Sequence, residues 1–148
     1  MTPDIAGRPQ LAVSAAIFRD RKLLLVRRAR SPGRGLYSLP GGRVEHGETL
    51  HQAVAREVRE ETGLAITIIG FAGWREVLPK PTTGRSGHYL VISFAAQWCG
   101  GEVMLNDELD DARWIAPAML DDMVRRGEIA TTEGLPGIVS AAAALAEA

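Results

Sequence analysis

The segment from Thr49 to Glu61 constrains the fold more than any other part of this chain. At helical spacing one face carries Leu50, Ala53, Val54, Glu57, Val58 and Glu61. Glu60 lies on the same side, next to Glu57. The face therefore begins with hydrocarbon and ends with carboxylates. The sequence predicts a helix whose first turns pack into a core and whose last turn and a half carries a cluster of negative charge.

This glutamate cluster calls for a counter-charge. Glu57 and Glu61 form an i,i+4 like-charge pair, which destabilises a helix by a few tenths of a kcal/mol. Partly buried carboxylates repel each other and lose hydration, so they need a cation or must take up protons. Cys and His are not present nearby at ligand spacing. Carboxylate oxygens alone suit Mg²⁺ or Mn²⁺ and argue against zinc.

Length and composition limit the class of protein. The 148 residues are 46% hydrophobic and 24% charged, which predicts one globular domain over 1–148. Seventeen basic and eighteen acidic side chains leave no field that would attract nucleic acid or an anionic membrane. The chain has one cysteine, Cys99, which cannot form an internal disulfide. It shows no signal-peptide pattern and no apolar run long enough to span a membrane. We expect a cytoplasmic protein without nucleic-acid or membrane partners.

The pattern of apolar residues and turn formers predicts strands alternating irregularly with helices. The strand candidates are 10–18 and 23–26 as a hairpin, 36–39 ending at Pro40-Gly41-Gly42, 65–77 as one bulged strand or two short strands, then 88–98, 102–105 and 112–115. Loops are expected at 79–87 and, strongly acidic, at 106–111. Besides the helix at 49–61, with Thr49 and Gln52 as a capping box and Gly63 as its C-terminal cap, helices are expected from Pro117 to Gly127 and over 138–148. This order favours an α/β fold with a mixed sheet between helix layers.

A longer motif surrounds the glutamate cluster. Its fixed positions are Gly42, Glu48, Arg56, Glu57, Val58, Glu60, Glu61, Gly63 and Leu64. This spacing resembles the signature of the Nudix hydrolases, and the flanking segments 39–42 and 112–115 are similar to segments common in that family. The resemblance implies the Nudix α/β/α sandwich with a mixed β-sheet. It also implies Mg²⁺- or Mn²⁺-dependent hydrolysis of a nucleoside diphosphate linked to another group, X.

The resemblance also implies roles for individual residues. Glu57, Glu60 and Glu61 correspond to the metal-binding glutamates, Gly41 to a residue that offers its carbonyl to the metal, Arg56 to a residue that orients a glutamate, and Gly42 and Glu48 to outer-shell positions. The general base stays open between Glu60, Glu57 and Glu108. Arg27, Arg28 and Arg34 are candidates to bind substrate phosphate, because guanidinium groups match phosphate oxygens.

The identity of the substrate stays open at this point. Pro79 follows Leu64 by fifteen residues (79 − 64), a spacing similar to the ADP-ribose pyrophosphatase branch of the family. ADP-ribose is therefore the first expectation, and a nucleoside triphosphate, oxidised or not, as in MutT-type enzymes, is the alternative. A third reading is a Nudix-fold module that senses a nucleotide without hydrolysing it. A homodimer is compatible with the family resemblance.

Overall fold

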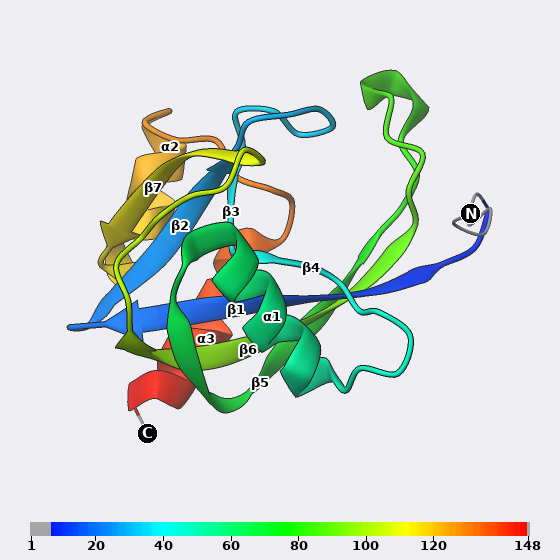
Figure 1. Ribbon diagram of the computed structural model, residues 1–148. Helices are drawn as coiled ribbons and strands as arrows, with labels where there is room; N and C mark the ends of the chain where they lie inside the picture. Colours follow the sequence, from blue (N-terminus) through cyan, green and yellow to red (C-terminus); the bar gives the residue numbers. More distant parts are fainter. Residues whose placement is uncertain (1–6, 148) are drawn as a thin grey trace.

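A seven-stranded mixed sheet forms the centre of the molecule (Figure 1). The computed structural model describes residues 7–147, so both ends of the predicted 1–148 domain lie outside the described part. The strands are β1 (Gln10–Arg19), β2 (Lys22–Arg28), β3 (Tyr37–Ser38), β4 (Gly41–Arg43), β5 (Ala65–Val77), β6 (Tyr89–Gly100) and β7 (Leu109–Ile115). They run in the order β3-β2-β1-β6-β5, with β4 paired to β1 and β7 paired to β2. Only the β1–β6 pair is parallel among these strands.

Helices cover both faces of this sheet, and each face has its own apolar core. The helices are α1 (Leu50–Thr62), α2 (Leu120–Arg125) and α3 (Leu135–Glu147), with short 3₁₀ turns η1 (Pro81–Thr83) and η2 (Pro117–Met119). Val54 and Val58 of α1 pack with Val13, Ile17 and other residues on one face. Residues of α2 and α3 pack on the opposite face, against the alternate residues of the same strands. The predicted α/β/α sandwich is therefore confirmed.

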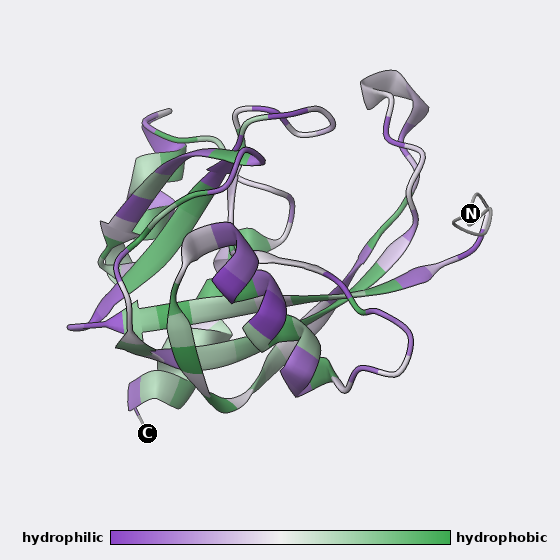
Figure 2. Cartoon of the chain, viewed as in Figure 1, coloured by the Kyte–Doolittle hydropathy of each residue, from purple (hydrophilic) through white to green (hydrophobic). Residues whose placement is uncertain are grey.

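Helix α1 begins and ends as the sequence predicts. The Thr49 hydroxyl accepts a hydrogen bond from the Gln52 backbone N–H (3.1 Å), and the Gln52 side chain accepts one from the Thr49 N–H (3.0 Å). Gly63 adopts the left-handed conformation (φ 76°), and its N–H donates to the Arg59 carbonyl. Figure 2 shows hydrophilic residues along the outward side of α1 and hydrophobic residues on the central strands. Both ends of the helix that carries the glutamates are thus fixed by local hydrogen bonds.

Several predicted boundaries are wrong, and each has a physical reason. The segment 40–42 does not simply stop a strand: Gly41–Arg43 forms β4, which pairs with β1. The segment 102–105 is not a strand, because its backbone bonds to the end of α1, with the Met104 N–H donating to the Thr62 carbonyl. Strand β7 begins at Leu109, inside the predicted acidic loop, since it pairs with β2.

The remaining elements differ less from the predictions. Strand β5 is a single strand with three register shifts against β6, which confirms the predicted bulge. The helix predicted from Pro117 is a 3₁₀ turn followed by α2, and the last helix begins at Leu135, before Ile138. Within residues 7–147, no helix has the length and apolar character needed to cross a membrane.

Candidate metal centre

Glu61 is the most enclosed acidic side chain of the predicted cluster. It is 7% exposed, and its Oε1 accepts a hydrogen bond from the Gly41 backbone N–H at 2.9 Å. Burial raises the pKa of the Glu61 carboxyl to about 8, the Gly41 N–H opposes this, and the negative charges of Glu57 and Glu108 raise the pKa further. Without a cation this carboxyl therefore holds its proton to a higher pH than an ordinary glutamate does.

Glu57 lies one turn before Glu61 and faces Gly42 of β4. A Cβ atom placed on Gly42 would be 2.4 Å from the Glu57 carboxyl carbon, so this carboxylate occupies space that only glycine leaves open. Burial raises the pKa of Glu57, and the neighbouring Arg56 lowers it. The strand β4 thus brings two backbone positions, Gly41 and Gly42, against the two more buried glutamates.

Arg56 holds the acidic groups around it in place. Its Nε donates to Glu48 Oε2 (2.7 Å), and its Nη1 donates to Glu57 Oε1 (3.0 Å) and Glu60 Oε2 (3.2 Å). A second amino group, Nη2, donates to the Arg43 carbonyl and to Glu48 Oε1. The Arg56 hydrogen bonds hold the pKa of Glu48 at about 2. Arg56 is therefore fixed by Glu48 and in turn orients Glu57 and Glu60.

The arrangement fits a divalent cation by its chemistry. In the part of the chain that is described, no three Asp, Glu, His or Cys side chains converge as a ready-made ligand set. Arg56 donates to one oxygen of Glu57 and one of Glu60, and the Gly41 N–H donates to one oxygen of Glu61. Glu61 nevertheless combines burial with repulsion from other carboxylates, which a bound hard cation would relieve.

The other predicted acidic residues lie on the same side of the molecule. Glu60 is exposed at the outer edge of α1, with its side chain 56% accessible. Glu108 is exposed in the loop before β7, and its charge raises the pKa of both Glu57 and Glu61. Both remain compatible with a role as general base.

The three candidate arginines are separated by the structure. Arg28 lies close enough to Glu61 for its positive charge to lower the pKa of that carboxyl. Arg27 pairs with Tyr37 across β2–β3, on the opposite face of the sheet, and its Nε bonds to Asp110 at 2.6 Å. Arg34 is exposed in the loop between β2 and β3. Of the three, Arg28 is the one placed beside the glutamate cluster.

Sequence reasoning missed Asn106. Its backbone N–H donates to the Glu61 carbonyl (3.1 Å), and its side-chain oxygen accepts from the Glu108 N–H (3.0 Å). It therefore ties the loop that carries Glu108 to the end of α1. The available signal was an Asn two residues before Glu108, which is typical of an Asx turn.

Comparison with known proteins shows the family of the chain. The family model described as the NUDIX domain matches residues 8–133. The chain belongs to the Nudix family. One Nudix relative is the ADP-ribose pyrophosphatase of Methanocaldococcus jannaschii, 39% identical over 106 residues, which are 72% of this chain and 61% of that protein. Another is the NAD-capped RNA hydrolase NudC of Stutzerimonas stutzeri, 39% identical over 130 residues, covering 82% of this chain and 42% of that protein.

Solved structures show the same fold. The crystal structure of a MutT NUDIX hydrolase from Burkholderia pseudomallei has a TM-score of 0.73 and 25% identity, with 90% of this chain and 97% of that chain covered. A NUDIX hydrolase from Nitrosomonas europaea has a TM-score of 0.74 at 24% identity, over 93% of this chain and 90% of that one. The chain spans less than two thirds of the length of the first curated Nudix relatives that it matches.

Proposed function

We propose that this Nudix protein is a metal-dependent pyrophosphohydrolase that cleaves a nucleoside diphosphate linked to a group X. The observation that carries the proposal is Glu61: a buried carboxyl with a raised pKa, repelled by neighbouring carboxylates and held by the Gly41 N–H. A buried carboxyl of this kind costs folding free energy, and such groups are typical of functional sites. In a Nudix protein that task is to hold Mg²⁺ or Mn²⁺ together with Glu57 and Glu60.

The residues of the chain have separable roles in this reaction. Glu57, Glu60 and Glu61 would hold the metal, with Gly41 able to offer its carbonyl. Arg56 fixes Glu57 and Glu60, and Glu48 fixes Arg56. When bound, a divalent ion would neutralise phosphate oxygens and make a bound water more acidic. Arg28 adds positive charge next to Glu61, where an anionic substrate needs it.

A carboxylate must also accept the proton of the attacking water. Glu60 and Glu108 are both exposed on the glutamate side, so each can reach solvent and substrate. Glu57 is more enclosed and is engaged by Arg56. We keep all three as candidates, to be separated by the pH dependence of kcat in single Gln variants.

ADP-ribose is the first substrate that we propose, with AMP and ribose 5-phosphate as products. The ADP-ribose pyrophosphatase relative and the position of Pro79 favour it. The NudC relatives make NAD-capped RNA a second candidate, contrary to the expectation that nucleic acid is no partner. The similarity to a MutT structure keeps nucleoside triphosphates as a third.

A substrate panel with Mg²⁺ tests the proposal. ADP-ribose, NAD-capped RNA, nucleotide sugars, dinucleotides and oxidised nucleoside triphosphates would be incubated with the protein, and the products separated by chromatography. We expect AMP and ribose 5-phosphate from ADP-ribose. A nucleoside monophosphate plus pyrophosphate would identify the triphosphate reaction instead. Nucleotide binding without turnover of any compound would favour the sensor reading and contradict the proposal.

A further inference from the structure

The segment between β6 and β7 runs past the end of α1 and bonds to its last turn (Figure 1). The Met104 backbone N–H donates to the Thr62 carbonyl at 2.8 Å, and the Asn106 backbone N–H donates to the Glu61 carbonyl at 3.1 Å. These bonds satisfy carbonyls that the end of a helix leaves free. They also place Asn106 directly beside the turn of α1 that carries Glu61.

The side chain of Asn106 closes a tight turn that leads to Glu108. Its Oδ1 accepts a hydrogen bond from the Glu108 backbone N–H at 3.0 Å, and its main-chain carbonyl accepts one from the Leu109 N–H at 3.4 Å. A side-chain oxygen that accepts from the backbone two residues later forms an Asx turn, which asparagine and aspartate favour. The side chain of Asn106 therefore fixes the backbone of Glu108 relative to the last turn of α1.

Glu108 is held on its other side by β2. The Ala29 N–H donates to the Glu108 carbonyl at 2.9 Å, and Leu109, the first residue of β7, is the Cα partner of Arg28. The β2–β7 ladder has a register shift at this point, and such irregularities are common next to functional sites. The backbone of Glu108 is thus bonded on both sides, to β2 directly and to α1 through Asn106.

Glu108 brings to the glutamate cluster a carboxylate that α1 does not supply. Its negative charge raises the pKa of both Glu57 and Glu61. Such an effect needs carboxylates that lie close together. The turn at Asn106 therefore presents Glu108 to the same centre as the glutamates of α1, from a separate segment of the chain.

The side chain and the backbone of Asn106 have separable tasks. The backbone N–H bond to Glu61 persists with any side chain that leaves the N–H in place, whereas the bond to Glu108 needs the side-chain oxygen. The neighbouring Asp107 forms an ion pair with Arg30 at 2.8 Å, but both side chains are largely exposed (80% and 64%), and such pairs contribute little to stability. Asn106→Ala thus removes one defined contact of Glu108, and Asp107→Ala is a matched change one residue away.

We propose that Asn106 is a positioning residue for hydrolysis, whose side chain holds Glu108 at the metal centre. This rests on the proposed pyrophosphohydrolase function and adds to it that Glu108 takes part in the reaction. Asn106 itself touches neither the metal nor the substrate and acts only through Glu108. A displacement of about 1 Å in a reacting group can lower the rate about a hundredfold, so the loss of one contact that forms the turn is enough to change kcat.

Steady-state kinetics of single variants test this role, with saturating Mg²⁺ and the substrate that the panel identifies. We expect Asn106→Ala to lower kcat about tenfold and to change KM by less than about twofold, because substrate binding does not use Asn106. Asn106→Asp, whose carboxylate can accept the same N–H, should restore most of the kcat, and Asp107→Ala should stay within about twofold of the unmodified protein. A kcat of Asn106→Ala within about twofold of the unmodified protein would overturn the proposal, even if that protein hydrolyses its substrate well.

A double-mutant cycle shows whether Asn106 acts through Glu108. Glu108→Gln should lower kcat at least about tenfold, and adding Asn106→Ala to it should lower kcat by less than about twofold more. A side chain that only stabilised the fold would lower kcat equally in both backgrounds. Equal losses in both backgrounds, or full activity of Glu108→Gln, would overturn the proposal.

A measurement without turnover separates this proposal from the proposed function. Mn²⁺, which is paramagnetic, is titrated into the ¹⁵N-labelled full chain, with Mg²⁺ as the diamagnetic reference, and the broadening of backbone amide signals is measured by NMR. We expect the Glu61 and Glu108 signals to broaden in the unmodified protein, and the Glu108 broadening to fall in Asn106→Ala and to return in Asn106→Asp. Equal broadening of Glu108 in the unmodified protein and in Asn106→Ala would refute the positioning role even when hydrolysis is observed. The expected loss of broadening without hydrolysis of any substrate would support the positioning of Glu108 and refute the hydrolase.

Discussion

At the scale of single residues, Glu61 combines the burial of a core residue with a group that can carry charge. Its neighbours on the same helix face, Val54 and Val58, are fully buried hydrocarbons. A glutamate at this third buried position, Glu61, costs folding free energy that an apolar residue would not. Packing therefore does not explain the carboxyl, which points to a role in function. This difference between Glu61 and its neighbours leads to the first prediction.

Glu61→Gln should remove catalysis and keep the fold. The amide oxygen of Gln can still accept the Gly41 N–H, whereas the negative charge that a divalent cation requires is lost. We expect kcat/KM with saturating Mg²⁺ to fall at least about a hundredfold, in line with the loss of an interaction with a catalytic metal. The control is Glu128→Gln, exposed in the turn after α2, which should keep full activity. Turnover of Glu61→Gln within about twofold of the unmodified protein would show that Glu61 is not a metal ligand.

Gly42→Ala tests the close approach of β4 to α1. The added methyl group would stand 2.4 Å from the Glu57 carboxyl carbon, so this carboxylate must move. We expect weaker Mg²⁺ activation, measured as a higher Mg²⁺ concentration for half-maximal rate. Gly137→Ala is the matched control, because a Cβ atom at Gly137 would meet nothing within 4 Å. Gly47→Ala is unsuitable as a control, because the φ of 86° at Gly47 would strain an alanine. An unchanged Mg²⁺ dependence in Gly42→Ala would show that the Glu57 position does not matter for the metal.

At the scale of elements, α1 works because its two ends are fixed by separate devices. The Thr49–Gln52 capping box begins the helix, and Gly63 ends it in the left-handed conformation. The segment after β6 then satisfies the last carbonyls, through the N–H groups of Met104 and Asn106. The glutamates in the last turn are thereby held against β4 and the loop that carries Glu108.

Thr49→Ala should weaken α1 from its first turn. The substitution removes the acceptor for the Gln52 N–H, which typically costs about 1 kcal/mol of unfolding free energy. Urea denaturation followed by circular dichroism measures this loss. The folded fraction should keep its kcat, because Thr49 lies at the opposite end of α1 from Glu61. Thr82→Ala, exposed in η1, is the control; an equal loss of stability there would contradict the assignment to the capping box.

Elements with local signals could be predicted, and those that depend on distant partners could not. The capping box, Gly63 and the glutamate face follow from residues within one helix, so the sequence alone indicates them. Strand β4 exists because Gly41 and Gly42 pair with β1, some thirty positions earlier in the chain. Segment 102–105 looks like a strand by composition, yet it bonds to the end of α1. Local patterns carry no information about such long-range pairing.

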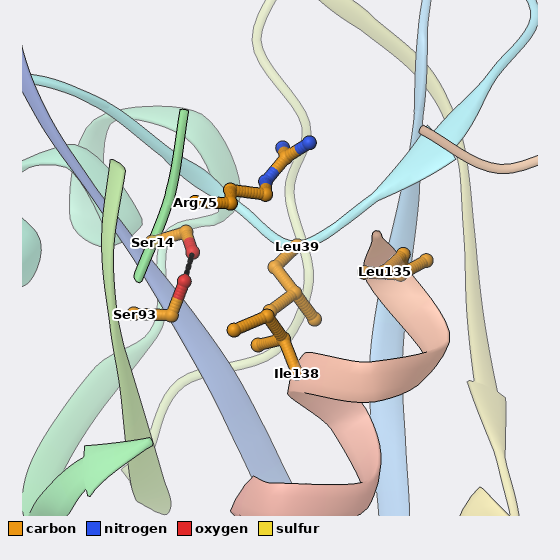
Figure 3. A pocket seen from close by; sticks show the side chains of 6 residues that line it. All are labelled: Ser14, Leu39, Arg75, Ser93, Leu135 and Ile138. Carbon is orange, nitrogen blue, oxygen red and sulfur yellow. Dashed lines mark hydrogen bonds between the residues drawn. The ribbon is translucent and has the colours of Figure 1, made fainter. Parts of the chain in front are cut away.

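At the scale of the whole molecule, the two faces of the sheet carry chemically different polar side chains. The face that packs against α1 carries the glutamates, and the opposite face, packed against α3, carries Arg75 and the Ser14–Ser93 pair. The motif indicates the glutamate cluster, because its residues lie within about twenty positions of one another. Arg75 becomes visible only when β5, β1 and α3 are placed together (Figure 3).

The free energy of unfolding of the metal-free protein should depend on pH through Glu61. Its carboxyl has a pKa of about 8 in the folded state, against an ordinary value of 4.5 in the unfolded chain. Between pH 4.5 and pH 8 the folded state binds more protons at Glu61 than the unfolded state does. The contribution of Glu61 to stability is therefore fully present below about pH 4.5 and is lost as the pH rises through about 8. The raised pKa of Glu57 acts in the same direction.

Thermal unfolding between pH 5 and 8, with and without Mg²⁺, measures this dependence. Saturating Mg²⁺ binds the ionised carboxylates of the folded state, so it should raise the Tm, and raise it more at pH 8 than at pH 5. Glu61→Gln cannot titrate at this position and should show a flatter pH profile without metal and a smaller response to Mg²⁺. If that variant kept both the slope and the Mg²⁺ response of the unmodified protein, the pH dependence would have to come from other groups, and the metal from another site.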